Sequence, residues 1–454
     1  MPLDIVILAA GQGTRMNSSR PKVLHTIAGK SMLQHVIDAA RVLDDAHLHV
    51  VIGHGADQIR NEIIGEDVHW VVQEKQLGTG HAVLQALPFL RPESTALVLY
   101  GDVPLVNPAS LKQLVLLADA KNMALLTVDL ENPAGYGRIL RDDNGRVVSI
   151  VEQKDATEEQ LRIHEVNTGI IAAPAEHLSR WLPALSCENA QGEFYLTDII
   201  AMAYTDGVCI HTQSALSEAE VLGVNDRYQQ AMLERIYQDK QASLLMAQGV
   251  TLMDPHRFDC RGQILAGRDV VIDVNVVFHG LVELGDNVII GPNCVISNAK
   301  VGRNSHIKAN TVIEDAVIGC GVDVGPFARL RPGTVLGDEA RIGNFVETKN
   351  AVLGDGSKAN HLAYIGDADI GVECNIGAGT ITCNYDGANK HKTIMGDNVF
   401  IGSNSTLVAP VVIENGGFVG AGSTVTKTVP EDNLAISRGH QRNIAGWNRP
   451  EKNK

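Results

Sequence analysis

Glycines and cations follow the first apolar run of the chain, which spans residues 4–10. Gly11 and Gly13 come directly after that run, and Arg15 and Lys22 stand beside them. Glycines after a strand let backbone N–H groups approach a phosphate closely, and two cations suit the charge of a triphosphate. The segment lacks the Gly-Lys-Ser/Thr of a Walker A loop, and Met16 stands where the dinucleotide fingerprint has its third glycine. The stretch therefore predicts a nucleotide-phosphate site of another type.

An acidic residue follows another apolar run of the chain. Asp102 follows the run at 95–100, and a carboxylate at the carboxyl end of a strand is well placed to hold Mg2+ against substrate phosphates. A turn residue or a helix N-cap is the alternative for Asp102. Between the two segments, Gly78 and Gly80 flank Thr79, where close packing against a flat base or sugar is favoured. Polar residues at 135–139, 151–154, 166–169 and 223–225 end further apolar runs and could read sugar hydroxyls.

A separate polar set lies in the last third of the chain. Arg331 and Lys349 are cations that could bind a phosphate. Imidazole is the side chain whose usual titration range suits proton removal near neutrality, so His361 is the candidate base, with a structural histidine as the alternative. An insertion at 382–392 adds amide, phenol and ammonium groups that suit a sugar phosphate.

Alternating strands and helices must position the first set. Buried strands are expected at 4–10, 48–52, 68–73, 95–100 and 123–129, and a helix at 31–43 with Ser31 as its N-cap. This alternation predicts a parallel sheet with right-handed crossovers, whose ligands bind at the carboxyl ends of the strands. Residues 226–248 predict one long helix, capped by Asp226 and ended by Gly249, that connects two domains. An imperfect apolar stripe is expected along it, formed by Met232, Leu233, Ile236, Tyr237, Leu244 and Leu245. A packed terminal helix of the first domain is the alternative.

A six-residue repeat from 264 to 425 must position the second set. The first position is aliphatic, as in Ile290-Gly291-Pro292-Asn293-Cys294-Val295, and the second is usually Gly, Asp or Glu. The aliphatic residue would fill a narrow core, and the glycine would supply a turn with positive φ. Three hexads make a triangular coil of about 18 residues, so the span predicts about nine coils of a solenoid. A β-sandwich is the alternative, but its strands do not keep so long a register.

The repeat breaks its period at particular places. One residue is lost between 296 and 301, 313 and 318, 348 and 353, and 365 and 370, and the larger insertion follows at 382–392. Insertions in solenoids form loops on one face, often the binding face. The polar set around His361 therefore belongs to a second active site rather than to the scaffold.

Composition excludes several classes of protein. The chain has 454 residues, a net charge of -15 and no basic block, so we expect two or more domains and no nucleic-acid partner. No apolar run approaches the ~20 residues of a membrane helix, so no membrane insertion is expected. The seven cysteines are scattered and odd in number, which favours a reducing, cytoplasmic location over a disulfide framework.

The first half resembles a known family. Leu8-x-x-Gly11-x-Gly13-Thr14-Arg15-Met16 followed by Pro21-Lys22 is similar to the signature of the sugar-phosphate nucleotidyltransferases, over about the first 225 residues. The resemblance implies a Rossmann-like mixed α/β sheet, and Mg2+ held by Asp102 and Asn225. The substrate contacts that it implies are Ala10, Gly11, Gly13, Arg15, Lys22, Gln73, Gly78, Thr79, Tyr100, Gly101, Asp102, Gly137, Glu152, Asn167 and Asn225. Within this set, Gln73 and 78–79 would read uracil, and Gly137, Glu152 and Asn167 the N-acetylhexosamine.

The second half resembles the left-handed β-helix acyltransferases. His361, Tyr364 and the Asn384-Tyr385 loop carry the likeness. The two halves together resemble the bifunctional GlmU family, in which an N-acetylglucosamine-1-phosphate uridylyltransferase is joined to a glucosamine-1-phosphate N-acetyltransferase. The implied organisation is a uridylyltransferase domain at 1–225, a linker helix at 226–249, and a left-handed parallel β-helix of hexapeptide repeats at 250–454 that forms a homotrimer.

The resemblance also implies the second reaction. Acetyl-CoA would acetylate the amine of glucosamine 1-phosphate, and UTP would then uridylylate the N-acetylglucosamine 1-phosphate, giving a precursor for peptidoglycan and lipopolysaccharide. His361 would be the catalytic base, oriented by Glu347. The implied sugar-phosphate contacts are Arg331, Lys349, Tyr364, Asn375 and Lys390, and the implied acetyl-CoA contacts are Ala378, Asn384, Tyr385, Ser403, Ala421 and Arg438.

Two other functions are compatible with a β-helix. A monofunctional nucleotidyltransferase could use the repeat only for assembly, but it would lack the constellation of His361, Tyr364 and the inserted loop. A metal-dependent hydratase of the carbonic anhydrase type would need three clustered histidines, whereas this repeat places its histidines at wide intervals.

Overall fold

The computed structural model describes residues 2–65, 67–450 and 452. It divides into two compact units, 1–237 and 238–454, and the boundary falls inside helix α7 (Arg227–Ala247). Asp226 caps this helix as predicted, because its Oδ1 accepts a hydrogen bond from the Gln229 backbone N at 2.8 Å. Gly249, at φ +96°, follows its end.

The apolar stripe predicted for α7 is only partly correct. Leu233 and Leu245 are buried, whereas Met232 and Leu244 are exposed. The fully buried side chain of Gln238 was not expected in the stripe, and it is satisfied by hydrogen bonds with the backbone of Cys260.

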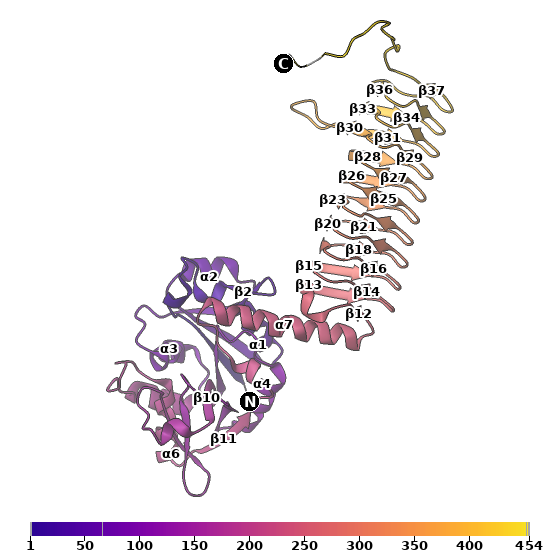
Figure 1. The fold of residues 1–454 in the computed structure, drawn as a ribbon. Coiled ribbons are helices and arrows are strands. Elements are labelled where there is room, and N and C mark those ends of the chain that lie inside the picture. The colour runs from indigo at the N-terminus through magenta and orange to yellow at the C-terminus, as the bar shows by residue number, and fades with distance from the viewer. Residues whose placement is uncertain (1, 66, 451, 453–454) are drawn as a thin grey trace. The chain divides into compact units, whose positions relative to one another are not determined.

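The first unit is a layered α/β structure built around one sheet, ordered β11-β7-β10-β6-β1-β4-β5, with β8 and β9 attached beside β10 (Figure 1). Its strands are β1 (Leu3–Ala9), β4 (Ala46–Ile52), β5 (Val68–Val72), β6 (Thr95–Tyr100), β7 (Asn122–Asp129), β8 (Arg138–Arg141), β9 (Val147–Val151), β10 (Glu165–Pro174) and β11 (Cys209–Ser214), besides the small hairpin β2 (Thr26–Ile27) and β3 (Lys30–Ser31). Its helices are α1 (Met32–Arg41), α2 (Ala56–Glu62), α3 (Thr79–Ala86), α4 (Pro108–Leu117), α5 (Ala175–Trp181) and α6 (Ile199–Thr205). The five predicted strands and the predicted helix are confirmed.

The parallel sheet predicted from the alternation of strands and helices is wrong at β10. β1 is parallel to β4 and β6, but β10 is antiparallel to both β6 and β7. The connection from β7 to β10 contains the β8–β9 hairpin instead of a crossover helix, so the chain returns in the opposite direction. The sheet is therefore mixed, as the family resemblance implied.

Helices cover both faces of this sheet. On one face α1 buries Leu33 and Ile37 completely, and α2 and α4 pack into the same core. On the other face α3, α5 and α6 contribute Val83, Leu178 and Ile199. Ser31 caps α1 as predicted, with its hydroxyl accepting from the Gln34 N at 3.3 Å. The first strand is buried along its whole length, so its carboxyl end is held rigidly.

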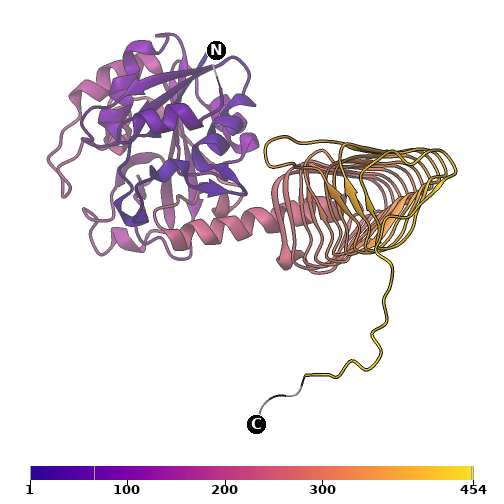
Figure 2. The ribbon, with the colours of Figure 1, turned by 90° about the horizontal axis from the view of Figure 1, so that it is seen from above.

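The second unit is a left-handed parallel β-helix (Figures 1 and 2). One side is formed by β12 (Thr251–Leu252), β14 (Val271–Ile272), β16 (Ile289–Ile290), β19 (His306–Ile307), β22 (Asp323–Val324), β25 (Arg341–Asn344), β27 (Lys358–His361), β29 (Asn375–Ile376), β32 (Phe400–Ile401), β35 (Phe418–Val419) and β37 (Leu434–Ala435). The other strands are β13 (Phe258–Ala266), β15 (Val276–Leu284), β17 (Val295–Ser297), β18 (Lys300–Val301), β20 (Val312–Glu314), β21 (Val317–Ile318), β23 (Arg329–Leu330), β24 (Val335–Leu336), β26 (Glu347–Leu353), β28 (Tyr364–Ile370), β30 (Ile381–Cys383), β31 (Thr393–Met395), β33 (Thr406–Val408), β34 (Val411–Ile413) and β36 (Thr424–Val425).

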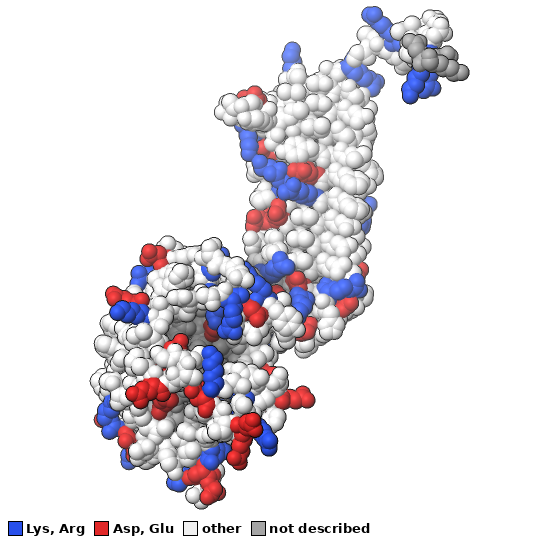
Figure 3. Space-filling view, turned by 60° about the vertical axis from the view of Figure 1, so that its left-hand side comes forward, with Lys and Arg blue, Asp and Glu red and all other residues white. Residues whose placement is uncertain are grey.

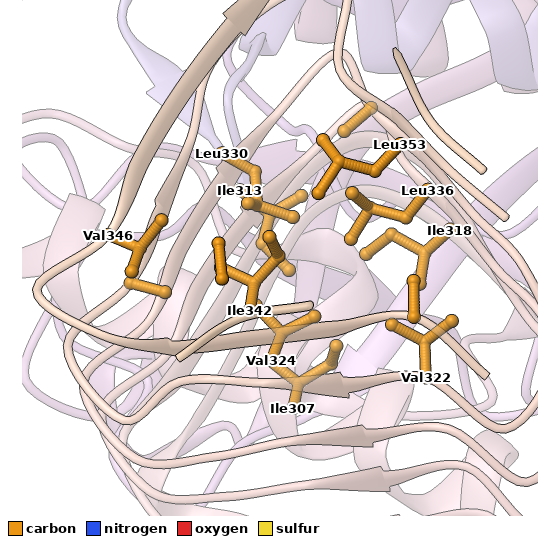
Figure 4. Packing of buried hydrophobic residues seen from close by; sticks show 14 of the residues in the cluster. Ile307, Ile313, Ile318, Val322, Val324, Leu330, Leu336, Ile342, Val346 and Leu353 are labelled. Atoms are coloured by element: carbon orange, nitrogen blue, oxygen red, sulfur yellow. The ribbon is translucent and has the colours of Figure 1, made fainter. Parts of the chain in front are cut away.

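The coil length follows the predicted period and its slips. Val271 pairs with Ile289, 18 residues later, whereas His306 pairs with Asp323, 17 residues later. The 25-residue step from Asn375 to Phe400 contains the predicted insertion, which projects as a loop between β30 and β31 (Figure 1). The first residue of each hexad points inward and packs on its counterparts in neighbouring coils, as Ile307, Val324 and Ile342 do (Figure 4).

The role predicted for the second-position glycine is wrong. Gly291 and Gly402 do not have positive φ, although Gly325 does. The left-handed turn is made at the fourth position instead, where Asn293 and Asn404 have φ of 59° and 54°. A Cβ on Gly402 would lie 2.4 Å from the Ala421 backbone N in the next coil. The glycine is therefore required by the close stacking of coils and not by a turn.

Two general features bear on function. Within the described residues no helix is long and apolar enough to cross a lipid bilayer. All seven cysteines carry free thiols.

Candidate active sites

A cavity of 460 Å³ lies at the carboxyl ends of β1 and β6 in the first unit. Eight of the predicted contacts line it: Ala10, Gly11, Lys22, Gln73, Gly78, Thr79, Tyr100 and Asp102. The topology brings these segments together because β1 and β6 are parallel neighbours that end at the same edge of the sheet.

The two glycines of the first loop have different roles. Gly11 is exposed, and nothing lies within 4 Å of where its Cβ would stand, so a ligand can approach its backbone. Gly13 has φ +62°, and a Cβ there would meet the Lys22 Cβ at 2.5 Å. Gly13 therefore allows the lysine to pass beneath the loop and into the cavity.

Charged and amide groups converge beside the phosphate loop. The Lys22 ammonium forms an ion pair with the Asp102 carboxylate and lies 3.3 Å from the Asn225 Oδ1. Arg15 Nη2 donates to the same Asn225 oxygen at 3.0 Å. One carboxylate oxygen and one amide oxygen thus face a single cation, although these residues are far apart in the sequence.

The predicted base-reading segment is held rigidly. The buried Gln73 donates from Nε2 to the Gly78 carbonyl at 3.3 Å, and that nitrogen lies 2.9 Å from the His81 Nδ1. These two contacts fix the orientation of the Gln73 side-chain amide. Gly78 has φ +114°, and a Cβ there would lie 2.6 Å from the Phe194 carbonyl. Thr79 Oγ1 accepts from the Leu196 N at 3.1 Å.

Tyr100 lines this cavity, and Gly101 follows it in the chain. The Tyr100 ring packs on Gly169, where a Cβ would lie 2.5 Å from the ring. Burial raises the pKa of Tyr100, and the nearby carboxylates of Glu152 and Asp102 add to this. Gly101 is buried, and its N–H donates to the Leu8 carbonyl at 2.9 Å.

The three residues predicted to read the sugar lie close together. A Cβ on Gly137 would stand 3.5 Å from the Glu152 carboxyl, and the Asn167 N–H donates to the Gly137 carbonyl at 2.8 Å. Burial raises the pKa of Glu152, while a hydrogen bond from the Thr197 hydroxyl, at 3.1 Å, opposes this rise. Asn167 Oδ1 accepts from the Gly169 N at 3.1 Å.

Sequence reasoning missed several residues of this site. Gln76 and Glu193 line the cavity, and Thr197 contacts Glu152. Gln76 lies within a recognised motif, but Glu193 and Thr197 come from the segment after β10, where no pattern in the sequence marks them.

His361 lies at a corner of the β-helix, at the end of β27. Its Nδ1 is 3.0 Å from Asn344 Oδ1, which lies directly below it in β25. Since Oδ1 can only accept, Nδ1 carries the hydrogen and Nε2 presents a lone pair. The expected orienting group, Glu347, instead pairs with Arg331 at 2.9 Å. Asn344 therefore replaces Glu347 as the group that orients His361.

Three cations gather on the neighbouring side of the β-helix. Arg331 follows β23, Lys349 lies in β26, and Lys390 reaches them from the inserted loop. The Lys390 ammonium, and to a lesser degree Arg331, lowers the pKa of Lys349 because like charges repel, and the Asp367 carboxylate opposes this effect. Lys and Arg side chains gather on the β-helix below the projecting loop in Figure 3.

A buried carboxylate lies beneath these cations. Asp367 accepts hydrogen bonds from Asn350, at 2.7 Å, and from Asn384. Burial opposes its ionisation, but these two hydrogen bonds and the lysines lower the pKa of Asp367 below its ordinary value. No pattern in the sequence marks Asp367 for this role.

The two tyrosines predicted for this site, Tyr364 and Tyr385, lie in different surroundings. Tyr364 packs over Gly366, where a Cβ would lie 2.4 Å from the phenol oxygen, so its hydroxyl is directed toward the column of Lys349. Asn384 is buried, whereas its neighbour Tyr385 is exposed in the loop and donates to the Gly387 carbonyl at 2.6 Å.

The predicted acetyl-CoA contacts mostly form a column. Ala378 lies one coil above His361, and Ser403 and Ala421 follow in the next two coils. Arg438 donates to the Ala421 carbonyl at 2.6 Å. Asn375 is the exception among the sugar-phosphate contacts, because it lies in β29, on a different side of the β-helix from the three cations.

Across residues 2–65, 67–450 and 452, no group of three or more His, Cys, Asp or Glu lies close enough to hold a metal ion. The three-histidine set that a carbonic anhydrase-type hydratase needs is therefore not assembled there.

Models of known families match both units. Residues 5–164 match the MobA-like NTP transferase domain, 260–346 the GMPPB C-terminal domain, and 392–427 the bacterial transferase hexapeptide (six repeats).

Curated relatives match the whole chain. Proteins named "Bifunctional protein GlmU" are 59% identical over 451 residues in Marinobacter nauticus and 61% over 450 in Cellvibrio japonicus, each covering 99% of both chains. The protein of that name in Stutzerimonas stutzeri is 59% identical over 452 residues and covers 100% of both. With the two sites described above, these matches establish that the chain belongs to the bifunctional GlmU family, which combines a uridylyltransferase with an acetyltransferase.

Proposed function

We propose that the 460 Å³ cavity transfers the uridylyl group and that the His361 corner transfers the acetyl group. The chain makes UDP-N-acetylglucosamine in two steps. Acetyl-CoA first acetylates glucosamine 1-phosphate, and UTP then reacts with N-acetylglucosamine 1-phosphate to release pyrophosphate. The convergence of Lys22, Asp102 and Asn225 at one edge of the sheet, and of His361 and Asn344 at one corner, carries this assignment.

Uridylyl transfer needs no protein nucleophile. The phosphate oxygen of the sugar 1-phosphate is already anionic, and it attacks the α-phosphorus of UTP in line while pyrophosphate leaves. The protein supplies alignment and charge. Arg15 and Lys22 neutralise the phosphates, Gln73 directs its amide at uracil, and Glu152 and Asn167 hold the sugar.

Asp102 and Asn225 would hold Mg2+. Their oxygens already converge on the Lys22 ammonium, and a carboxylate with an amide oxygen is a hard-donor pair that suits this ion. When bound, Mg2+ would neutralise developing charge on the triphosphate. Lys22 is then free to contact phosphate oxygens.

Acetyl transfer begins with the removal of a proton from the substrate. The ammonium of glucosamine 1-phosphate cannot attack a thioester, so the Nε2 lone pair of His361 removes a proton from it. The free amine attacks the acetyl carbonyl and the C–S bond breaks. The nitrogen then loses its second proton to the leaving sulfur, so the amide forms and CoA departs as a thiol. Arg331, Lys349 and Lys390 bind the sugar phosphate, and Tyr364 lies beside them.

The acetyl-CoA chain would lie along the column above His361. Ala378, Ser403 and Ala421 have small side chains, which leave space along the outside of the coils. Arg438 supplies a cation at the upper end of this column, and Asn384 and Tyr385 complete the contacts near the loop.

The position of Asn375 supports a homotrimer. If Asn375 contacts the sugar phosphate, a neighbouring subunit must bring its face to the cations of the first, since the two lie on different sides of one β-helix. Closed rings of three suit a prism with three sides. The free thiols suit a reducing, cytoplasmic location.

Two variants separate the reactions. His361→Ala should abolish thiol release from acetyl-CoA and leave uridylyl transfer intact. Asp102→Ala should do the reverse, measured as pyrophosphate release with Mg2+ present, and EDTA should stop only uridylyl transfer. Equal loss of both activities in either variant would contradict the assignment. Wild type supplied with glucosamine 1-phosphate, acetyl-CoA and UTP together should form UDP-N-acetylglucosamine.

A further inference from the structure

Histidines gather at the amino ends of the strands in the first unit, at the edge of the sheet opposite the nucleotide cavity. His47 and His49 lie on β4, two residues apart and therefore on one face. His69, on β5, stands directly opposite His49 in the parallel pair. Neither proposed reaction uses these side chains.

Two imidazole nitrogens face each other at this edge. His49 Nδ1 and His69 Nδ1 are 3.3 Å apart. Two nitrogen ligands that each lie ~2.0–2.1 Å from one ion, at a tetrahedral angle, are themselves ~3.3–3.4 Å apart. The observed separation therefore matches that of two ligands on one metal ion.

A buried carboxylate orients the first of these imidazoles. His49 Nε2 lies 3.5 Å from Asp4 Oδ1, and Asp4 is completely buried. Arg91 holds that carboxylate in place, with its Nη2 3.0 Å from Oδ1 and its backbone N 2.9 Å from Oδ2. A carboxylate on the far nitrogen of an imidazole keeps the hydrogen there and leaves the near nitrogen bare, as in many metal sites.

The site is open to further ligands. An open cavity of 510 Å³ is lined by both imidazoles, His47, Asp67 and Phe89. The Phe89 ring packs against His69, with ring centroids 4.4 Å apart, and limits its movement. In the described part of the chain no third His, Cys, Asp or Glu completes the set, so water would fill the remaining positions.

We propose that His49 and His69 bind one divalent transition-metal ion of the zinc class, which fastens the edge strand β5 to β4. Imidazole nitrogens favour such ions, whereas Mg2+ prefers oxygen donors. This ion is therefore distinct from the one expected at Asp102. β5 ends just before Gln73, so fastening it would stabilise the segment that reads the base.

Cobalt(II) tests the proposal, because its visible spectrum reports the ligands. The full chain is titrated with Co2+ in excess Mg2+. We expect one equivalent to bind, with the spectrum of nitrogen and oxygen ligands and no thiolate charge-transfer band from Cys187 or Cys209. His69→Asn should weaken binding at least tenfold, and His211→Asn, a change on β11 of the same sheet, should not. Hydrogen exchange in β5 should slow when Co2+ is added to wild type but not to His69→Asn.

A simple hydrogen bond between the two rings is the alternative. No saturable binding of Co2+, binding through thiolates, or equal binding by His69→Asn and wild type would overturn the proposal. His69 is exposed, so its replacement should leave the fold intact, and circular dichroism and uridylyl transfer with Mg2+ confirm this for each variant.

Discussion

Removal of the Asn344 side chain should slow acetyl transfer without affecting uridylyl transfer. Asn344 Oδ1 accepts from the His361 Nδ1 at 3.0 Å, and this hydrogen bond holds the ring with its hydrogen on Nδ1 and its lone pair on Nε2. When His361 takes up a proton the bond becomes charge-assisted, and such bonds contribute about 1.5–3 kcal/mol. Since Asn344 is partly exposed and His361 is exposed, the lower end of this range applies, which corresponds to about tenfold in rate.

The assay is thiol release from acetyl-CoA at saturating glucosamine 1-phosphate. Asn344→Ala should lower kcat about tenfold and change KM little, because Asn344 has no proposed contact with either substrate. Asn344→Asp keeps an acceptor oxygen at the same place and should restore most of the rate. Pyrophosphate release in the same preparations is the internal control.

Three outcomes would refute the reasoning. An unchanged kcat in Asn344→Ala would show that the hydrogen bond does not orient the base. A rise in KM alone would place Asn344 in substrate binding, and a parallel loss of uridylyl transfer would indicate damage to the fold.

Three further predictions follow from the two units. Gly11→Ala should lower the rate of uridylyl transfer at least tenfold, because the added Cβ would extend into the space where the nucleotide phosphates are expected to approach. Thermal stability and acetyl transfer should not change, since nothing in the protein lies within 4 Å of that Cβ. Gly302→Ala should cost about 1–3 kcal/mol and lower the unfolding temperature, because its Cβ would lie 2.5 Å from the Gly319 backbone carbon in the next coil. Gly439→Ala, with nothing within 4 Å, is the matched control, and equal stability of the two variants by calorimetry would contradict the stacking argument. The lowered pKa of Asp367 means that its charge stabilises the β-helix fully above about pH 5 and that this contribution is lost as the pH falls through the lowered pKa, below the ordinary 3.8. Urea unfolding of Asp367→Asn between pH 3 and 6 should therefore show a weaker pH dependence than wild type, and identical slopes would refute the assignment.

Local patterns predicted the elements of both units well. The strand at 95–100 was expected within the bounds at which it occurs, and Ser31 and Asp226 cap the helices that they were expected to cap. These features depend on neighbours within a few residues, where apolar periodicity and capping preferences act directly. The antiparallel direction of β10 could not be obtained in this way, because it depends on how the hairpin between β7 and β10 folds back on the sheet.

The sequence by itself determined the hexapeptide scaffold, the phosphate loop and the chemical types at each site, since a six-residue period and a glycine-rich loop are local properties. The tertiary structure decided which group touches which. Asn344 lies beneath His361 only because the coil between them has 17 residues, and an added residue would move the amide off this column. The same stacking excludes a Cβ at Gly402. Contacts between coils depend on register, and register is fixed only when the whole core packs.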